Sequence, residues 1–317
     1  MSEKIIISPL DWGLGHATRL VPIIRLYLEQ GAEVEIASAL SLKDFFAKEF
    51  PALVWRETPA YDIKYPEHGW QMPFWAFSQM QRIKKIMKEE NRWLNAMHEK
   101  QKYTLVISDN RFGFFNKKIK SIYITHQLRI AFPKFFAIFE KAGENWHKNI
   151  MKNFDEIWVP DYEEFPGLAG KLSHPSYKSE KIKYIGPLSR LFTDVPDSYN
   201  HVPKTIDILA LLSGPEPQRS FFEKYAIKYL SENPGNHCII RGLPSETEVP
   251  CLPFQAFNHL SAQALREKIL ASRMVLCRSG YSTIMDLALL KAKAILVPTP
   301  GQTEQEYLAK INFLNCP

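Results

Sequence analysis

The sequence Cys277-Arg278-Ser279-Gly280-Tyr281-Ser282-Thr283-Ile284-Met285-Asp286 decides the fold of the C-terminal half of the chain. The apolar run 273–277 that leads into it is typical of a buried parallel strand. Gly280 then allows a sharp turn and a close approach of a ligand to the backbone. After the turn, Ser282 or Thr283 is expected to cap a helix. A strand, a glycine turn and a helix in this order direct backbone N–H groups beyond the strand end, an arrangement that suits a phosphate.

A second polar loop is expected beside the first. The apolar run 294–298 predicts the next strand, and the loop 299–305 follows it. In open parallel sheets, ligands bind at the edge where the strands end. Asp286, placed in the first turn of the predicted helix, could accept hydrogen bonds from a sugar diol. An ordinary capped helix would explain a lone glycine turn, but two adjacent polar loops favour a binding site.

These two stretches resemble the donor-binding half of the MurG-like glycosyltransferases, which have the GT-B fold and a C-terminal domain of the glycosyltransferase family 28 type. The resemblance rests on the Cys-Arg-Ser-Gly turn, a threonine, an acidic helix residue, a Val-Pro strand end and a glutamine-bearing loop. It implies that Asp286 holds the ribose hydroxyls and that Gln305 helps to read the donor sugar. The family often has two adjacent glutamines where this chain has Gln305-Glu306, which leaves the sugar open. The donor-side residues that the resemblance implies are Ser213, Gly214, Arg219, His259, Leu260, Arg278, Ser279, Gly280, Ser282, Thr283, Asp286, Gly301, Glu304 and Gln305.

The N-terminal half begins with a strand, a glycine-containing loop and a helix. Gly13 and Gly15 form half of a dinucleotide fingerprint, but the third glycine and the acid that should close the second strand are missing. The loop resembles instead the Gly-Gly-His loop of the same glycosyltransferases, in which the histidine faces the acceptor. His16 is therefore the first candidate for the general base, because a helix N-terminus disfavours imidazolium and keeps the ring able to accept a proton.

Three further polar residues are candidates for the acceptor side. Asp11 is either a rival base or the residue that orients His16. Asp109 and His126 each follow a predicted strand, and with Gly13 and Gly15 they are expected to line the acceptor site. For each of these side chains, the structural alternative is an ordinary polar residue that caps or packs at a loop.

The alternation of strands and helices predicts an α/β protein with doubly wound parallel sheets. The resemblance implies that these sheets form a GT-B fold, two Rossmann-like domains that face each other across a cleft. A length of 317 residues is enough for two hydrophobic cores. We expect an acceptor-side domain over 1–187, a linker over 188–204 and a nucleotide-sugar-binding domain over 205–317.

Composition and charge set limits on the location of the protein. The four cysteines lack metal-ligand spacing, no apolar run approaches membrane-spanning length, and no signal peptide is expected, so a cytoplasmic protein is predicted. The net charge of +6 suits a phosphate-rich ligand or an anionic membrane surface. Aromatic and lysine residues in the predicted helix 74–100 and in 132–141 would fit peripheral membrane contact at the inner face. We favour a core-facing stripe with a solvated basic face.

The resemblance implies an inverting glycosyltransferase that moves a hexose or N-acetylhexosamine from a UDP-sugar to an acceptor, which would be lipid-linked or glycan-linked. No Asp-x-Asp motif is present, so neither a metal nor another cofactor is expected; nucleic acid is not an expected partner. The leaving diphosphate would be stabilised by the helix end after Gly280, by amides near Ser213, and by Arg278 or Arg219. A nucleotide-sugar 2-epimerase, which shares the fold, and a non-catalytic nucleotide-sugar sensor are the alternatives.

Overall fold

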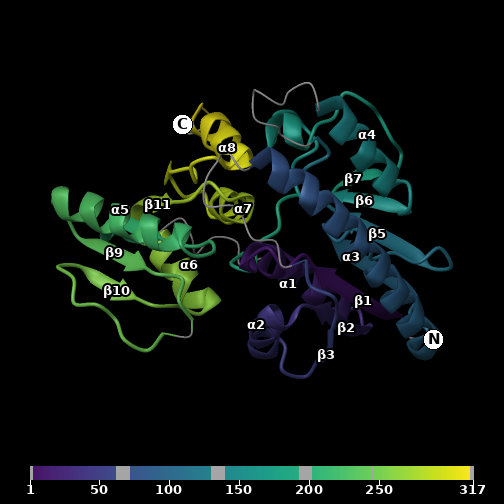
Figure 1. The fold of residues 1–317 in the computed structure, drawn as a ribbon. Coiled ribbons are helices and arrows are strands. Elements are labelled where there is room, and N and C mark those ends of the chain that lie inside the picture. The colour runs from purple at the N-terminus through teal and green to yellow at the C-terminus, as the bar shows by residue number, and fades with distance from the viewer. Residues whose placement is uncertain (1–2, 62–71, 130–139, 193–201, 245, 315–317) are drawn as a thin grey trace. The chain divides into compact units, whose positions relative to one another are not determined.

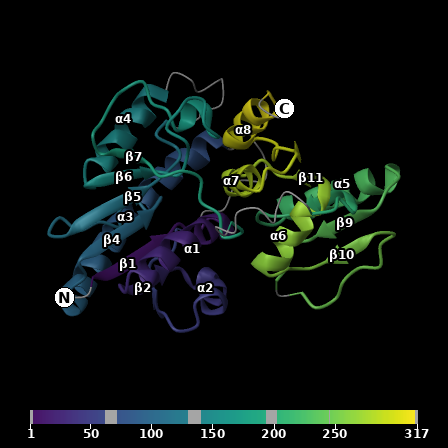
Figure 2. The ribbon, with the colours of Figure 1, turned by 180° about the vertical axis from the view of Figure 1, so that it is seen from behind.

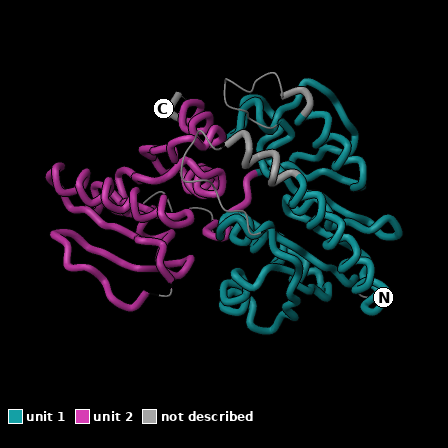
Figure 3. Tube along the Cα trace, in the orientation of Figure 1, with its two compact units in different colours: residues 1–186 teal, residues 187–317 magenta. Residues whose placement is uncertain are grey.

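The computed structural model describes residues 3–61, 72–129, 140–192, 202–244 and 246–314. The chain divides into two compact units, residues 1–186 and residues 187–317 (Figure 3). Each unit is built on its own parallel sheet with helices packed against it, as the alternating pattern of strands and helices predicts.

Unit 1 carries a seven-stranded sheet within the described residues, with strand order β3-β2-β1-β4-β5-β6-β7 and every pairing parallel (Figure 1). Its elements in chain order are β1 (Lys4–Pro9), α1 (Leu14–Glu29), β2 (Glu33–Ser38), η1 (Leu40–Leu42), α2 (Lys43–Glu49), β3 (Val54–Glu57), α3 (Met72–Gln101), β4 (Leu105–Asp109), β5 (Lys120–Ile124), α4 (Glu140–Met151), β6 (Glu156–Val159), η4 (Gly170–Leu172) and β7 (Ile182–Tyr184).

The central strands β1 and β4 of the unit 1 sheet are buried because they contain continuous apolar runs. Ile5, Ile6 and Ile7 of β1 are all fully buried, as expected for a parallel strand covered on both faces. The α3 helix contributes Leu94 to the cluster around Ile6. The lysines of α3 at positions 84, 85 and 88 are exposed, as in a helix with one core-facing stripe. The side chains of 132–141 lie outside the described residues.

Unit 2 carries a five-stranded sheet within the described residues, with parallel order β10-β9-β8-β11-β12. Its elements are β8 (Ile206–Leu211), α5 (Gln218–Glu232), β9 (His237–Ile240), β10 (Gln255–Phe257), α6 (Ala262–Leu270), β11 (Ser272–Cys277), α7 (Tyr281–Leu289), β12 (Ala294–Leu296) and α8 (Thr303–Leu314). No described helix combines the length and the apolar composition that a membrane span requires.

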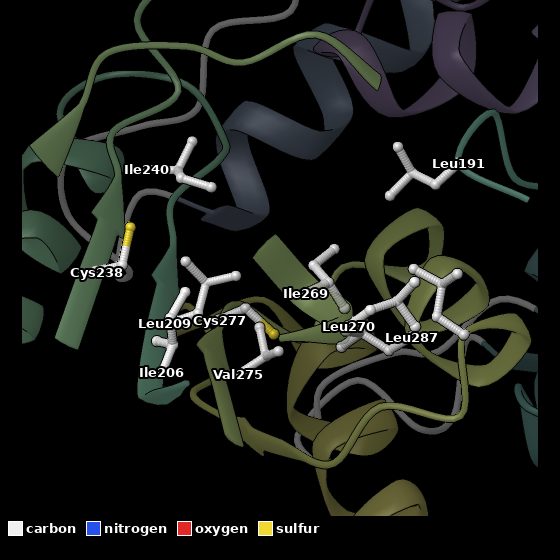
Figure 4. Packing of buried hydrophobic residues seen from close by; sticks show 11 residues of the cluster. Leu191, Ile206, Leu209, Cys238, Ile240, Ile269, Leu270, Val275, Cys277 and Leu287 are labelled. Atoms are coloured by element: carbon white, nitrogen blue, oxygen red, sulfur yellow. The ribbon is translucent and has the colours of Figure 1, made fainter. Parts of the chain in front are cut away.

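Alternating side chains of the unit 2 strands feed two cores, one on each face of the sheet. Leu209 of β8 lies in a cluster with residues of α6 and α7, which Figure 4 shows from close by. The next residue, Ala210, packs with Phe222 of α5 on the other face. Leu191, from the segment predicted as a linker, is buried in the first of these clusters. That segment, 188–204, is therefore part of unit 2 at its start, and 193–201 lie outside the described residues.

The strand orders create one topological switch point in each sheet. In unit 1 the chain runs outward from β1 through β2 to β3 and then returns to β4 on the other side of β1. Figure 2 shows β2 and β4 on opposite sides of β1. In unit 2 the same happens at β8 and β11, which are neighbours although β9 and β10 lie between them in sequence. Doubly wound sheets bind ligands in the crevice that such a reversal opens at the carboxyl ends of the strands.

Candidate active site

The switch point of unit 1 brings together the predicted catalytic histidine and a buried carboxylate. His16 lies in the first turn of α1, directly after β1, and Asp109 is the last residue of β4. The neighbouring strands β1 and β4 pair in register with Pro9 opposite Asp109. His16 Nδ1 lies 3.2 Å from Asp109 Oδ2. Gly13 makes the turn possible, because its φ of 84° at the N-cap of α1 lies in the region that favours glycine.

Arg19 and His126 complete a buried polar cluster around Asp109. Arg19 Nε donates to Asp109 Oδ2 at 2.7 Å, and its Nη2 donates to Asp109 Oδ1, so the carboxylate is held by a two-pronged ion pair. Arg19 Nη1 lies 3.3 Å from Nδ1 of His126. Asp109, Arg19 and His126 are buried, whereas the side chain of His16 keeps 15% of its surface exposed. His16 is thus the member of the cluster that a substrate can reach.

The electrostatics of the cluster fix where its protons lie. Although burial opposes ionisation, Arg19 and His16 hold the pKa of Asp109 below its usual range. Burial lowers the pKa of His16, and this effect together with nearby Arg19 outweighs the opposing influence of Asp109. Near neutral pH, therefore, Asp109 is a carboxylate and His16 is neutral. A carboxylate only accepts hydrogen bonds, so the proton of His16 resides on Nδ1 and its Nε2 carries the lone pair of a base.

The structure corrects the expected partner of His16. The carboxylate hydrogen-bonded to the ring is that of Asp109, which the sequence placed only on the acceptor side. Asp11 instead accepts from the backbone N–H of Tyr61 at 3.0 Å, and so ties the loop after β1 to the segment after β3. Gly15 accepts a hydrogen bond from the hydroxyl of Thr18 and belongs to the first turn of α1. Asp109 and His126 are bridged by Arg19, and their place on the acceptor side stays a prediction.

The switch point of unit 2 brings together two turns that were predicted on the donor side, one at Ser213 and the other at Gly280. The turn at Ser213 and Gly214 follows β8, and the turn at Gly280 follows the adjacent β11. Ser213 and Gly214 are exposed, and Gly214 has a φ of 102°. A side chain at Gly280 would meet no atom within 4 Å, so the backbone before α7 is open to a ligand. The φ of Gly280 is −70°, a value that any residue adopts. The glycine therefore leaves room for a ligand, and the turn itself does not require it.

The start of α7 differs from the sequence expectation. The helix begins at Tyr281 with Gly280 as N-cap, and neither Ser282 nor Thr283 caps it, because both already lie within the helix. Asp286 is consequently in the second turn and not in the first. Its carboxylate accepts a hydrogen bond from the hydroxyl of Ser189. Burial raises the pKa of Asp286 to about 7.

The two arginines expected near phosphate have protein partners. Arg278 is buried with its guanidinium 4.4 Å from the ring centre of Phe222. Its Nη1 donates to the carbonyl of Pro298 at 2.9 Å, and its Nη2 donates to that of Gln218 at 3.4 Å. Arg278 therefore joins the ends of β11 and β12 to α5, and its contact with a phosphate stays a prediction.

Arg219 is likewise neutralised within the protein. It pairs with Glu216 at 2.5 Å and with Glu223 at 2.8 Å. Glu216 lies just before α5, and Glu223 lies one turn after Arg219 within it. Glu223 also pairs with Arg241, which follows β9, and Arg241 in turn donates to Asn258 after β10 at 2.7 Å. The result is one ionic network that joins the loops after β8, β9 and β10. The contact of Arg219 with a phosphate stays a prediction.

The glutamine expected to read the sugar braces its own loop. The side chain of Gln305 accepts from the N–H of Thr299 at 2.9 Å and donates to the side chain of Gln302 at 2.6 Å. Its backbone carbonyl accepts from the hydroxyl of Ser279 at 2.7 Å, which links the loops after β11 and β12. Gln302, which the sequence analysis did not select, is thereby held beside Gln305.

The remaining donor-side predictions lie along the same edge of the sheet. Gly301 is exposed with a φ of 81°, and its N–H donates to the carboxylate of Glu306 at 3.1 Å. Glu304 lies in the first turn of α8. His259 is exposed and Leu260 half-buried after β10, two strands away from β8. The described residues contain no cluster of three or more histidine, cysteine or acidic side chains that could hold a metal ion.

Sequence reasoning missed Arg19 and Ser189. Arg19 carried a usable signal, since it lies three residues after His16 and such pairs share one face of a helix. Ser189 carried no local signal, because its partner Asp286 is 97 positions away.

Comparison with known proteins agrees with this architecture. Residues 245–311 match the family model for the glycosyltransferase family 28 C-terminal domain. No curated protein matches the chain in sequence. Among solved structures, the kitacinnamycin glycotransferase is similar with a TM-score of 0.69 at 14% identity, over 99% of this chain and 85% of that one. A spinosyn rhamnosyltransferase solved with thymidine diphosphate gives 0.63 at 11% identity, over 97% and 83%. MurG of Acinetobacter baumannii gives 0.55 at 13% identity, over 99% and 84%.

The fold and the matched domain define a glycosyltransferase of the GT-B class, which confirms the predicted fold class and the predicted type of enzyme. More particularly, residues 245–311 of its second unit match the glycosyltransferase family 28 C-terminal domain, in the part of the chain where the donor site was predicted.

Proposed function

We propose that the protein transfers a hexose or an N-acetylhexosamine from a UDP-sugar to an acceptor hydroxyl, with inversion and without a metal ion or another cofactor. The observation that carries the proposal is the contact between His16 and Asp109 at the switch point of unit 1. A neutral histidine whose Nδ1–H is held by a carboxylate is a general base, and glycosyl transfer to a hydroxyl needs such a base.

The proposed chemical step uses the chain's own groups on the acceptor. Nε2 of His16 takes the hydroxyl proton while the acceptor oxygen attacks the anomeric carbon. The bond from that carbon to the diphosphate oxygen breaks, and its electron pair leaves with the nucleotide. Attack from the face opposite the leaving group inverts the anomeric centre. Asp109, kept ionised by Arg19, stabilises the imidazolium that forms.

Unit 2 is proposed to hold the donor. The N-terminal end of α7 behind the open position at Gly280, together with the exposed turn at Ser213 and Gly214, would stabilise the diphosphate through backbone N–H groups and the helix dipole. The spinosyn rhamnosyltransferase with bound thymidine diphosphate supports a nucleoside diphosphate as ligand. The UDP identity rests on the resemblance of the donor loops.

The acceptor is proposed to be lipid-linked or glycan-linked, and the enzyme is proposed to act in the cytoplasm at the inner face of the membrane. Both statements rest on the resemblance to MurG-like enzymes. The exposed lysines of α3 would support contact with an anionic surface.

A ligand panel tests the proposal. Thermal unfolding should be followed with UDP, TDP, GDP and their sugars, because a ligand at a hundred times its Kd adds about 2.7 kcal/mol of stability. Turnover should then be measured with the stabilising donor. Sugar transfer that requires an acceptor supports the proposal. Epimerisation of the donor without an acceptor would identify a 2-epimerase, and tight binding without any turnover would identify a sensor.

A further inference from the structure

The segment that opens unit 2 lies against α7, the helix that carries Asp286. The hydroxyl of Ser189 donates to Oδ1 of Asp286, and the same hydroxyl oxygen accepts from the N–H of Leu191 at 3.0 Å. The N–H of Leu188 lies 3.4 Å from the sulfur of Met285. Ser189 is 4% exposed, so this hydroxyl is fixed by two bonds in a site nearly closed to water.

Hydrophobic packing holds the segment in this place. Leu191 is buried in the core cluster that contains Leu287, the residue next to Asp286 (Figure 4). Polar contacts at Leu188 and Ser189 and an apolar contact at Leu191 thus fasten one short stretch of chain to one turn of α7. Such a rigid support is what an oriented side chain in a binding site requires.

We propose that Ser189 is a positioning residue of the donor site, which holds the carboxylate of Asp286 in the orientation that accepts hydrogen bonds from the ribose hydroxyls of the nucleotide. The inference rests on the proposed function, because it takes unit 2 as the donor-binding unit. An ionised carboxylate offers about four acceptor positions on two oxygens. Ser189 occupies one of these and fixes the rotation of the group, and Asp286 is only partly buried, which leaves the others to a diol.

The same hydroxyl also favours the form of Asp286 that accepts hydrogen bonds. Burial raises the pKa of Asp286 to about 7, while the bond from Ser189 and the charge of Arg190 lower it. Within the described residues, these two groups are the ones that act on the carboxyl besides burial. Loss of the hydroxyl should therefore move the titration of Asp286 to higher pH.

The test is the affinity for a UDP-sugar measured by calorimetry between pH 5.5 and 8.5. A UDP-sugar is chosen over UDP because a terminal phosphate itself titrates at about pH 6. Wild-type affinity should weaken as the pH falls through about 7, since protonation removes the acceptor. In Ser189→Ala the midpoint should rise by about one pH unit or more, the size expected for loss of a hydrogen bond to a charged group. Ser189→Thr, which keeps a hydroxyl, should restore the wild-type midpoint.

Asp286→Asn supplies the matched control and a second test. It should bind the UDP-sugar weakly and without this pH dependence, and adding Ser189→Ala to it should change nothing further. A folded Ser189→Ala with the wild-type midpoint, or a pH dependence that persists in Asp286→Asn, overturns the inference alone. Absence of any UDP-sugar or TDP-sugar binding to the wild type overturns the proposed function as well.

Discussion

Nδ1 of His16 lies 3.2 Å from Oδ2 of Asp109, although 93 positions separate the two residues in the chain. The contact exists because β1 and β4 are adjacent in the sheet while β2 and β3 lie on the other side of β1. A reversal in strand order therefore does more here than open a crevice. It places a buried carboxylate beside an imidazole that is only 15% exposed, and this pair is the general base that we propose.

Replacing His16 by alanine should lower turnover by about 10²–10⁴-fold, because the general base is removed. Nucleotide affinity should stay nearly unchanged, since the donor is assigned to unit 2. The wild-type rate should fall on the acid side as His16 becomes protonated, at a pH below about 6.5, because burial lowers the pKa of His16. The variant should lack this limb in a pH–rate profile. Near-normal turnover in His16→Ala would assign the base to another residue.

Asp109→Asn and Asp11→Asn form a matched pair of variants. Asp109→Asn should lower turnover strongly, because the amide no longer fixes the proton of His16 on Nδ1. It should also cost about 3–5 kcal/mol of stability, since the buried guanidinium of Arg19 loses its counter-charge. Asp11→Asn should cost less turnover, as its carboxylate bonds a backbone N–H. Steady-state kinetics with urea unfolding measures both effects, and the reverse order of kcat values would restore Asp11 as the catalytic partner.

Asp286→Asn should change the pH dependence of stability. Burial raises the folded-state pKa of Asp286 to about 7, above its value of about 3.9 in an unfolded chain. The folded state therefore holds a proton that the unfolded state has lost, and the stability from this proton is complete below about pH 4 and lost as pH rises through 7.

The variant should thus equal the wild type at about pH 4 and exceed it in Tm at pH 8, because it carries no charge to bury. Thermal unfolding at several pH values checks this expectation. Asp44→Asn, at an exposed position of α2, gives the baseline for a solvent-facing carboxylate. Parallel Tm curves for Asp286→Asn and the wild type would contradict the raised pKa.

Chelation by EDTA should leave turnover unchanged, because the proposed mechanism assigns the leaving-group charge to backbone N–H groups and a helix end. The measurement compares initial rates in enzyme treated with EDTA before and after addition of Mg²⁺ or Mn²⁺. Loss of activity that either ion restores would show that the reaction uses a metal ion.

Much of the fold could be predicted because its signals are local. The apolar run at 5–7 and the glycine-punctuated turns at 13 and 280 each specify their own strand or turn. His16 and Asp109 could be chosen singly, since His16 stands at a predicted helix start and Asp109 at a predicted strand end. Their contact could not be predicted, because it depends on strand order, which neither segment contains.

The donor side shows the same limit. Asp286 could be selected from its place on a helix, but its bond to Ser189 depends on where the segment after unit 1 packs. The roles of Arg278 and Gln305 also depended on tertiary contacts, since a long polar side chain can turn to its own protein as readily as to a ligand. Residue type and spacing predict the backbone position of such a side chain but not the group that its polar end contacts.

The ionic network around Glu223 has a consequence for exchanging donor preferences between relatives. Glu223 pairs with Arg219 and Arg241, and Arg241 donates a hydrogen bond to Asn258. The starts of three loops are therefore held together by shared ion pairs and a hydrogen bond. If one of these loops were exchanged alone, its charged residue would lose the ion-pair partner that lies on another loop. Chimeric enzymes should therefore inherit the segments 213–223, 241–248 and 258–260 as one cassette.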